Sequence, residues 1–271
     1  MKMIPNDYFK QIDNEEKAYI LGFMAADGHI APPYRFRLTL AEEDKEILIK
    51  IKNAMKCGNI TYVKKYPICF DGKTYNCQNQ WRYSINSKNL VDDLYKFGVV
   101  GTKTYSVRIP KLIPINLLPH FVRGYFDGDG CISVSGKYKN YYRINICVNK
   151  QFGKQLIKLL NDNNIKSILG KEERNIHKIR IDSAYEVGKF CKWLYTDATI
   201  YLDRKYKKYL DLAKTKYINQ KIKSSKYIGI HKRKNKWIAT GQSNKKQIYI
   251  GIFDTELQAY KAKIKYQLTQ I

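Results

Sequence analysis

The sequence predicts an α+β protein made of two similar halves, each in the order helix, strands, helix, strands, helix, followed by a smaller unit of three strands and one helix. Three observations predict this fold: a segment of about a hundred residues that occurs twice, strands that alternate apolar and polar residues, and a weakly hydrophobic stretch near residue 216. The chain has 271 residues, of which 44% are hydrophobic, enough for two or three compact units.

The internal repeat begins with a short motif. It reads YILGFMAADGHI from Tyr19 and FVRGYFDGDGCI from Phe121, at an offset of 102 residues. The matched pairs are Gly22 with Gly124, Asp27 with Asp129, and Gly28 with Gly130. Similar segments follow both copies in the same order, so we expect two halves related by a pseudo-two-fold axis.

Each motif is expected to lie on a helix. Asp13 can cap the first helix, with Glu16 completing a capping box, and this helix should end near Gly28. Pro114 marks the start of the second helix. The segments RFRLTLA, QWRYSIN, YRINICV and HKIRIDS alternate at period two, which predicts strands with one buried face and one basic face.

The motif helices have small residues one turn apart. These are Ala18, Gly22 and Ala26 in the first helix, and Gly124 and Gly128 in the second. Small residues let two helix backbones approach closely, although they could instead relieve crowding in a core. If the helices pack side by side, Asp27 and Asp129 come together, and their repulsion favours a cation between them.

The formal charge of +26 points to a polyanionic partner such as nucleic acid. The alternative is a composition bias, because 40 of the 50 basic residues are Lys, as AT-rich coding DNA would produce. No stretch reaches the roughly 18 apolar residues of a membrane span, and the first residues lack the apolar core of a secretory signal. Six Cys and four His show no zinc spacing. We therefore expect a soluble, intracellular protein with reduced thiols, in the cytoplasm, the nucleoid, a phage-infected cell or an organelle.

The last part of the chain predicts a second compact unit. Residues 219–271 have a net charge of +10, against +16 for the much longer residues 1–218. The pattern indicates three short strands and a helix from Thr255. The residues expected to cover the sheet are Leu257, Ala259, Tyr260, Ile264 and Leu268.

The motif pair YILGFMAADG and FVRGYFDGDG resembles the two LAGLIDADG motifs of a single-chain homing endonuclease, over roughly residues 1–215. The second copy matches better, since the first has Ala25 where the family has an Asp that is usually structural. The resemblance implies that the motif helices, through Gly22 and Gly124, form the joint between the halves, and that the strands make a saddle of antiparallel sheet over the DNA major groove.

The same resemblance implies a site-specific endonuclease of a mobile genetic element that hydrolyses both strands of double-stranded DNA with Mg²⁺ or another divalent ion such as Mn²⁺. The implied metal ligands are the Asp27 and Asp129 carboxylates and the Ala26 and Gly128 carbonyls. Lys103 and Lys205 each lie 76 residues after a motif Asp and match basic residues near the scissile phosphates. The alternative for both is an ordinary lysine of a surface helix or loop.

DNA contacts are expected from outward-facing strand residues. The candidates are Arg35, Arg37, Arg82, Arg143 and Arg180, because Arg reads guanine bidentately in the major groove. Each could instead anchor a phosphate or remain a solvated surface charge.

The C-terminal unit resembles the Apetala-two/ethylene-response-factor DNA-binding domain. The match rests on Gly229, Trp237, Gly251, Phe253, Thr255 and Ala259. It implies that the sheet enters the major groove and that Lys232, Arg233, Lys236 and Trp237 contact DNA, whereas Trp237 could instead be a core aromatic. A tethered second module would lengthen the residence time on DNA.

The expected organisation is a monomer with one half in residues 1–112, the second in 113–215, a linker in 216–226 and the C-terminal unit in 227–271. The chain begins with Met and lacks the terminal residues of protein splicing, so we expect a free-standing protein rather than an intein. The alternatives are an RNA-binding intron maturase or a non-cleaving DNA-binding regulator of the same fold. A generic basic RNA-binding protein would leave the repeat unexplained.

Overall fold

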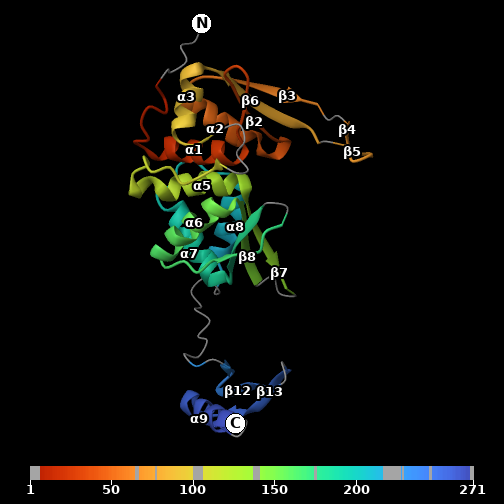
Figure 1. Ribbon diagram of the computed structural model, residues 1–271, viewed down its shortest axis with the longest axis vertical. Coiled ribbons are helices and arrows are strands. Elements are labelled where there is room, and N and C mark those ends of the chain that lie inside the picture. Colours follow the sequence, from red (N-terminus) through yellow and green to blue (C-terminus); the bar gives the residue numbers. More distant parts are fainter. Residues whose placement is uncertain are drawn as a thin grey trace. The chain divides into compact units, whose positions relative to one another are not determined.

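A computed structural model describes most of the chain. The described residues are 7–64, 67–76, 78–99, 106–136, 141–173, 176–215, 227, 229–243 and 246–268. Their contacts divide the chain into two compact units, Met1–Ile218 and Asn219–Ile271 (Figure 1), and each unit is described here by itself.

The first half of the larger unit carries a four-stranded antiparallel sheet. Its helices are α1 (Glu15–Asp27), α2 (Lys45–Met55, after the short 3₁₀ helix η1, Glu42–Asp44) and α3 (Lys88–Lys96). Its strands are β1 (His29–Ala31), β2 (Arg35–Ala41), β3 (Asn59–Val63), β4 (Pro67–Phe70), β5 (Lys73–Asn76) and β6 (Gln80–Asn86). The sheet has the order β1-β2-β6-β3, and β4 pairs with β5 in a separate hairpin. Asp71 and Gly72 turn this hairpin at positive φ, as a two-residue turn requires.

The second half repeats this topology. Its helices are η2 (Ile115–Leu117), α5 (Leu118–Asp129), α6 (Lys150–Asp162), α7 (Ala184–Tyr195) and α8 (Asp203–Ala213). Its strands are β7 (Gly130–Ser135), β8 (Tyr141–Val148), β9 (Ile168–Leu169) and β10 (His177–Asp182). The sheet order β7-β8-β10-β9 is the same as that of the first half once the β4–β5 hairpin is set aside. The predicted α+β class with repeated helix and strand order is confirmed.

The helix starts differ in detail from the expectation. Asn14, not Asp13, caps α1, since its Oδ1 accepts a hydrogen bond from the backbone of Lys17 at 2.9 Å. Asp13 instead pairs with the Lys17 side chain at 3.0 Å. In the second half Pro114 precedes the 3₁₀ turn η2, and α5 begins only at Leu118. The first helix does end as expected, because Gly28 N–H bonds back to the carbonyl of Met24.

Period-two alternation places one face of each sheet in the core. Phe36 and Leu38 on β2 are fully buried, as are Ile144 and Ile146 on β8. The intervening residues of β2 and β8 are only partly buried or exposed. Helices cover the buried faces, with α2 against β3 and β6 and with α7 against β8 and β10. The opposite faces therefore carry the polar and basic residues of both sheets.

The C-terminal unit is a three-stranded antiparallel sheet with one helix. Its elements are β11 (Ile230–Arg233), β12 (Lys236–Ser243), β13 (Lys246–Phe253) and α9 (Glu256–Leu268). Thr255 caps the helix by accepting a hydrogen bond from the backbone of Gln258 at 3.2 Å. Ala259 is buried against the sheet and Tyr260 is partly buried. The expectation that Leu257 and Ile264 cover the sheet is wrong, because both are exposed.

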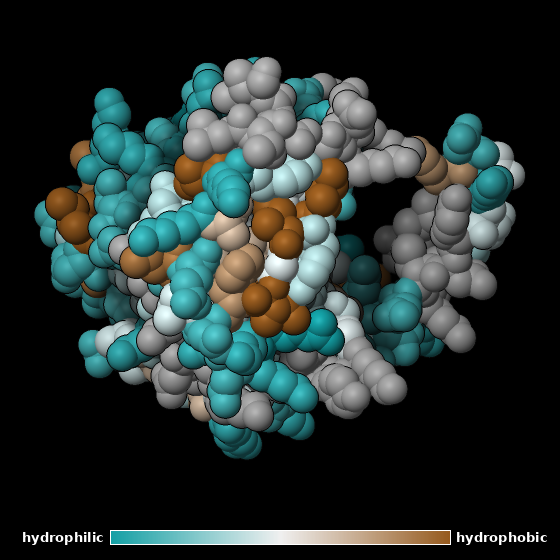
Figure 2. Space-filling model, turned by 90° about the horizontal axis from the view of Figure 1, so that it is seen from below, coloured by the Kyte–Doolittle hydropathy of each residue, from teal (hydrophilic) through white to brown (hydrophobic). Residues whose placement is uncertain are grey.

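The side chains on the surface agree with the high net charge of the chain. The face seen in Figure 2 is mainly hydrophilic, with hydrophobic side chains gathered in small patches. Among the residues that the structure describes, no helix combines the length and apolar character that a membrane crossing requires.

Candidate functional site

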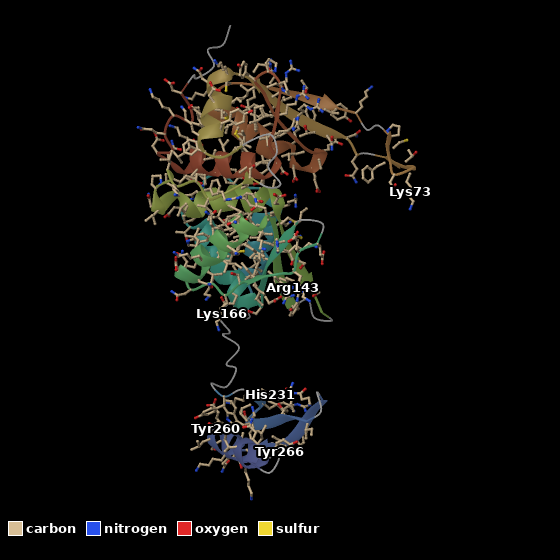
Figure 3. All side chains as sticks on the ribbon, viewed as in Figure 1. Lys73, Arg143, Lys166, His231, Tyr260 and Tyr266 are labelled. Carbon is tan, nitrogen blue, oxygen red and sulfur yellow. The ribbon has the colours of Figure 1, made fainter. Side chains whose placement is uncertain are left out.

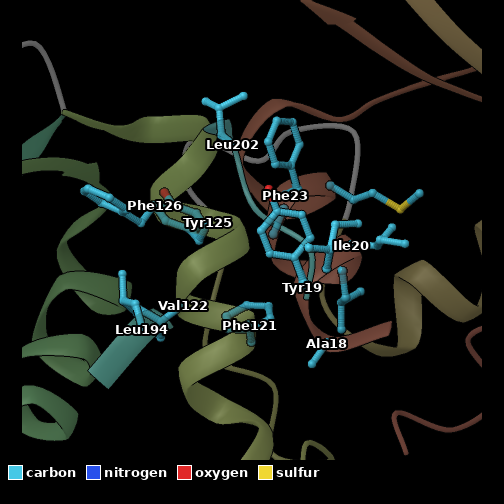
Figure 4. Packing of buried hydrophobic residues seen from close by; sticks show 14 of the residues in the cluster. Ala18, Tyr19, Ile20, Phe23, Phe121, Val122, Tyr125, Phe126, Leu194 and Leu202 are labelled. Atoms are coloured by element: carbon cyan, nitrogen blue, oxygen red, sulfur yellow. The ribbon is translucent and has the colours of Figure 1, made fainter. Parts of the chain in front are cut away.

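The joint between the two halves is the packing of α1 against α5. These helices form the most extensive contact between any two described elements and lie side by side in Figures 1 and 4. A Cβ atom at Gly22 would collide with the carbonyl oxygen of Phe121, and a Cβ at Gly124 would collide with that of Tyr19. The two backbones are thus in direct contact, which only glycine at these two positions permits.

The two motif aspartates lie at the C-terminal ends of these packed helices. A Cβ at Gly128 would lie 3.0 Å from Oδ2 of Asp27, so the Asp27 carboxylate is next to the last turn of α5. Burial raises the pKa of Tyr125 well above its ordinary value, and the charges of Asp129 and Asp27 raise it further. Asp129 directly follows Gly128 in α5, so the two aspartates belong to the same end of the joint. The structure brings Asp27 and Asp129 to one site, where both are half-buried.

A small cavity opens beside Asp129. It has a volume of about 210 Å³ and is lined by residues of both halves, among them Ala25 and Ala26 of α1, Tyr125 and Asp129 of α5, and Asn149. Ala26 is one of the two residues whose carbonyls we expect to bind metal, and Gly128 is the other. Ala26 and Asp129 therefore both face this cavity at the ends of the two helices.

The donor set suits a hard divalent cation that keeps part of its water shell. Within the described residues no cluster of three His, Cys, Asp or Glu side chains could hold a metal by itself. Two carboxylates with nearby backbone carbonyls provide oxygen ligands only, and Mg²⁺ characteristically uses one or two carboxylates with water and phosphate oxygens. The residues present therefore fit Mg²⁺ or Mn²⁺ bound together with a phosphate-containing substrate.

The earlier motif position differs between the halves. Asp127 is fully buried, and its Oδ2 accepts hydrogen bonds from the Tyr19 hydroxyl and the Leu202 backbone, both at 2.8 Å. Burial raises the pKa of Asp127 to about 6, although the charge of Lys205 opposes the shift. The corresponding Ala25 is buried and needs no partner. Asp127 thus connects α5 to α1 and to the segment before α8.

Lys205 is buried, not a solvated surface lysine. Its side chain is 2% exposed, and Nζ donates hydrogen bonds to the carbonyls of Phe126 at 2.6 Å and Asp127 at 2.7 Å. Burial lowers the pKa of Lys205 to about 8, and the charge of Asp127 acts in the opposite direction. A cation at a helix C-terminus satisfies carbonyls that lack helical partners. Lys205 therefore fixes the last turn of α5. Lys103 lies outside the described residues.

A buried ion pair at the other end of the joint was not predicted from the sequence. Arg123 on α5 is fully buried and pairs with Glu15 at the start of α1. Arg123 also donates to the carbonyls of Leu194 at 2.7 Å and Ile200 at 3.0 Å. Glu15 in turn accepts from the backbone of Thr199 at 2.7 Å. The only sequence signal is a charged residue within the apolar run FVRGYF.

The outward face of the first sheet is strongly basic. A cavity of about 990 Å³ is lined by three of the expected DNA-contacting residues, Arg35, Arg37 and Arg82, and by Lys52 and Lys56 at the end of α2. Two of the arginines are held by neutral groups. Arg35 Nε donates to Oδ1 of Asn86 at 3.0 Å, and Arg82 Nε donates to the Thr39 hydroxyl at 3.2 Å.

The second sheet arranges its arginines around one carboxylate. Arg143 (labelled in Figure 3) donates through Nε to Oδ1 of Asp182 at 2.6 Å. Arg180 Nε lies 2.9 Å from Oδ2 of the same residue. Burial raises the pKa of Asp182, but the hydrogen bond from Arg143 and the charges of both arginines outweigh it, so this pKa lies below its ordinary value.

The expected DNA-contacting residues of the C-terminal unit lie on or near β11 and β12. Lys232 and Arg233 are exposed, and the Lys232 ammonium lies 5.7 Å from the centre of the Trp237 ring. Lys236 forms an ion pair with Asp254. Trp237 is partly buried and packs against the small core, so it serves at least in part as a core aromatic.

Comparisons with known proteins give one match to a family model and several similar solved structures. The family model described as LAGLIDADG-like domain matches residues 118–194. No curated protein matches the chain. Among solved structures, LAGLIDADG meganuclease I-AabMI bound to uncleaved DNA is 16% identical, with 74% of this chain and 89% of that chain covered and a TM-score of 0.49.

Two further solved structures are similar. LAGLIDADG homing endonuclease I-GzeII in complex with its DNA target is 13% identical, with 75% of this chain and 89% of that chain covered and a TM-score of 0.48. Full-length DUF199/WhiA from Thermatoga maritima is 18% identical, with 78% of this chain and 64% of that chain covered and a TM-score of 0.45. The family match covers residues 118–194, which run from the start of α5 almost to the end of α7.

Proposed function

We propose that this protein is a site-specific endonuclease that hydrolyses both strands of double-stranded DNA with Mg²⁺ or a similar divalent ion. One observation carries the proposal: two glycine-packed helices from the two halves end in Asp27 and Asp129, and a cavity lined by Ala26 and Asp129 opens at these ends. The LAGLIDADG-like domain on residues 118–194 supports the same conclusion.

The chemistry follows from the donor set. Two carboxylates at the same end of the joint repel each other, and a divalent cation between them would relieve this repulsion. When bound, the ion supplies the positive charge that activates water and stabilises the negative charge developing on the phosphate. Asp27 and Asp129 would hold it, with the carbonyls of Ala26 and Gly128 as further oxygen ligands.

The buried groups around the site act as supports. Lys205 bonds the last carbonyls of α5, and Asp127 connects the same turn to Tyr19 of α1. These bonds keep the Asp129 backbone in place relative to Asp27. We infer that Lys205 is a positioning residue, since its ammonium is buried on carbonyls, and this revises the catalytic role expected from the sequence.

Two similar halves suit a two-stranded substrate. The two backbones of a DNA duplex are related by local two-fold symmetry, as are the two motif aspartates in our proposal, so each half addresses one strand. The arginines on the sheets bind the duplex on both sides of the cut. Because both halves lie in one chain, the protein acts as a monomer. The basic C-terminal unit, as an Apetala-two-like module, adds a second contact with DNA.

The test separates cutting from binding. Asp27→Asn and Asp129→Asn should each lower the cleavage rate by at least about a hundredfold with unchanged affinity for the target, because each removes a ligand charge used in the transition state. Asp162→Asn, an exposed aspartate at the end of α6, is the matched control. Specific DNA binding with no metal-dependent cutting would favour a DNA-binding regulator, and preference for folded RNA would favour a maturase.

A further inference from the structure

Asp182 holds two arginines on the outward face of the second sheet. Asp182 lies directly opposite Arg143 in the β8–β10 pairing, and Arg180 lies two residues before Asp182 on β10. Its Oδ1 accepts from Arg143 Nε at 2.6 Å and from the Tyr141 hydroxyl at 3.2 Å, and its Oδ2 lies 2.9 Å from Arg180 Nε. Both carboxylate oxygens are thus occupied by protein groups.

Asp182 contacts each arginine through the Nε atom of that arginine. This contact does not use the terminal Nη groups. Arg143 Nη2 also donates to the Tyr141 hydroxyl at 2.7 Å, whereas its Nη1 makes no hydrogen bond to a described residue. The same holds for both Nη groups of Arg180, again within the described part of the chain. The side chains are 35% and 45% exposed. Each guanidinium is therefore oriented by its Nε, and Nη1 of Arg143 and both Nη groups of Arg180 keep their donors for a ligand.

The first half has the same pairing in a weaker form. Arg35 lies opposite Asn86 in the β2–β6 pairing, as Arg143 lies opposite Asp182, and donates to it through Nε at 3.0 Å. An amide has one carbonyl oxygen where a carboxylate has two. Ser84, two residues before Asn86, occupies the position that Arg180 has in the second half. Asn86 therefore orients one arginine and Asp182 orients two.

Extending the proposed function, on which this inference rests, we propose that Asp182 is a specificity-determining positioning residue that holds Arg143 and Arg180 to read two guanines at neighbouring base pairs of the target. The Nη end of arginine matches the O6 and N7 acceptors of guanine in the major groove. Diagonal neighbours on paired strands are about 7–8 Å apart at the backbone. Two long side chains at this spacing can reach adjacent base pairs. Holding each guanidinium beforehand lowers the entropy cost of that contact.

Charge favours bases over phosphates as the contact. A phosphate anchor works through positive charge that is not compensated within the protein, whereas Asp182 neutralises one of the two arginine charges and would itself repel a nearby phosphate. Direct reading of cytosine by Asp182 is disfavoured because both its oxygens already accept hydrogen bonds. The cluster is therefore suited to base recognition through its arginines.

The experiment is a binding selection with the full chain on randomised double-stranded DNA without Mg²⁺, followed by sequencing. The wild-type protein should enrich guanine at two neighbouring positions. Asp182→Ala should reduce the guanine preference about tenfold at both positions, in line with the value of a bidentate contact. Asp182→Asn, which keeps a single carbonyl acceptor, should reduce it at only one of them. Asp162→Asn, which removes the same charge at the exposed end of α6, should change neither.

A second set of variants does not depend on Asp182. Arg143→Lys and Arg180→Lys keep the charge but lose the bidentate geometry, so each should relax one of the two positions and leave the other unchanged. A specific target whose base preferences are unaffected by Asp182→Ala, or weakened uniformly along its length, would overturn the inference and leave the proposed function standing. Absence of any sequence-specific DNA binding would overturn both.

Discussion

The two halves of the larger unit are alike where they touch each other and different where they face outward. At the joint, Gly22 and Gly124 make the same backbone contact with the opposite helix. On the sheets, the residue opposite the first arginine is Asn86 in one half and Asp182 in the other. Both halves have glycine at the joint because the two helix backbones are in direct contact there and leave no room for a side chain. The outward faces of the two sheets have no such constraint, and they carry different charged residues.

A second difference between the halves is the buried polar side chains at the end of the motif helix. The second half has a buried Asp127 and a buried Lys205 at the end of α5, and the first half has Ala25 at the position of Asp127. The polar pair connects the C-terminal turn of α5 to α1 and α8, so the end of the second motif helix is held by side-chain hydrogen bonds. Similar backbones are thus supported by different chemistry.

The largest expected effect comes from the shared joint. Gly22→Ala and Gly124→Ala should each lower the free energy of unfolding by more than about 3 kcal/mol, at the upper end of overpacking costs, because the added methyl meets backbone. Chemical denaturation followed by circular dichroism measures this. Gly170→Ala, where the nearest atom is 3.2 Å away, is the control and should cost far less. An unchanged free energy of unfolding for either joint variant would contradict the equivalent backbone contact of Gly22 and Gly124.

The buried lysine of the second half should have the next largest effect. Lys205→Met keeps the length of the side chain but removes the donor to the carbonyls of Phe126 and Asp127, and we expect a loss of about 2 kcal/mol in the free energy of unfolding. Lys207→Met, on the exposed side of the same helix, should be nearly neutral. Unchanged stability with lost cleavage would instead give Lys205 a direct chemical role.

Removal of the C-terminal unit tests whether it only assists. A chain that ends at Thr215 should fold and cut the same site, with an affinity for DNA lowered about tenfold, because a tethered module contributes through effective concentration. Dissociation rates on the target give the measurement. Failure of the shortened chain to fold would contradict the division of the chain into separate units.

The smallest effect should come from exchanging the outward residues. Asn86→Asp places in the first half the carboxylate that the second half has, and neutralises part of the Arg35 charge. The slope of log affinity against log salt should fall by about one unit or less, with a loss of about threefold in non-specific DNA affinity. Asn161→Asp on the exposed side of α6 makes the same change of net charge at a helix and is the control. Equal effects of both variants would mean that only total charge matters.

Much of the fold was predictable because repetition and alternation are properties of the sequence. The duplicated motif predicted two packed helices, and the alternating segments predicted β2, β6, β8 and β10 almost to the residue. The helix starts were less predictable, since Asp13 and Asn14 are both good caps and the sequence does not choose between them. The β4–β5 hairpin was not predicted, although Asp71 and Gly72 form a typical hairpin turn.

The site was predictable only in part, because partners far apart in sequence decide how its residues act. The motif placed Asp27 and Asp129 at one end of the joint. The pairing of Glu15 with Arg123 spans 108 residues, and no local pattern indicates it. Burial of Lys205 likewise depends on where α8 packs, which spacing alone does not determine. The contact of Asp182 with two arginines could be predicted only from the register of β8 and β10, which the alternation pattern does not specify.

The most direct test of the central claim is cleavage of a randomised double-stranded DNA library by the full chain, with and without Mg²⁺. We predict discrete cut sites on both strands that require the ion and are lost in Asp129→Asn, which should still bind the same sequences. Cutting that persists in Asp129→Asn or without a divalent ion, or specific binding with no cutting at all, would contradict the account.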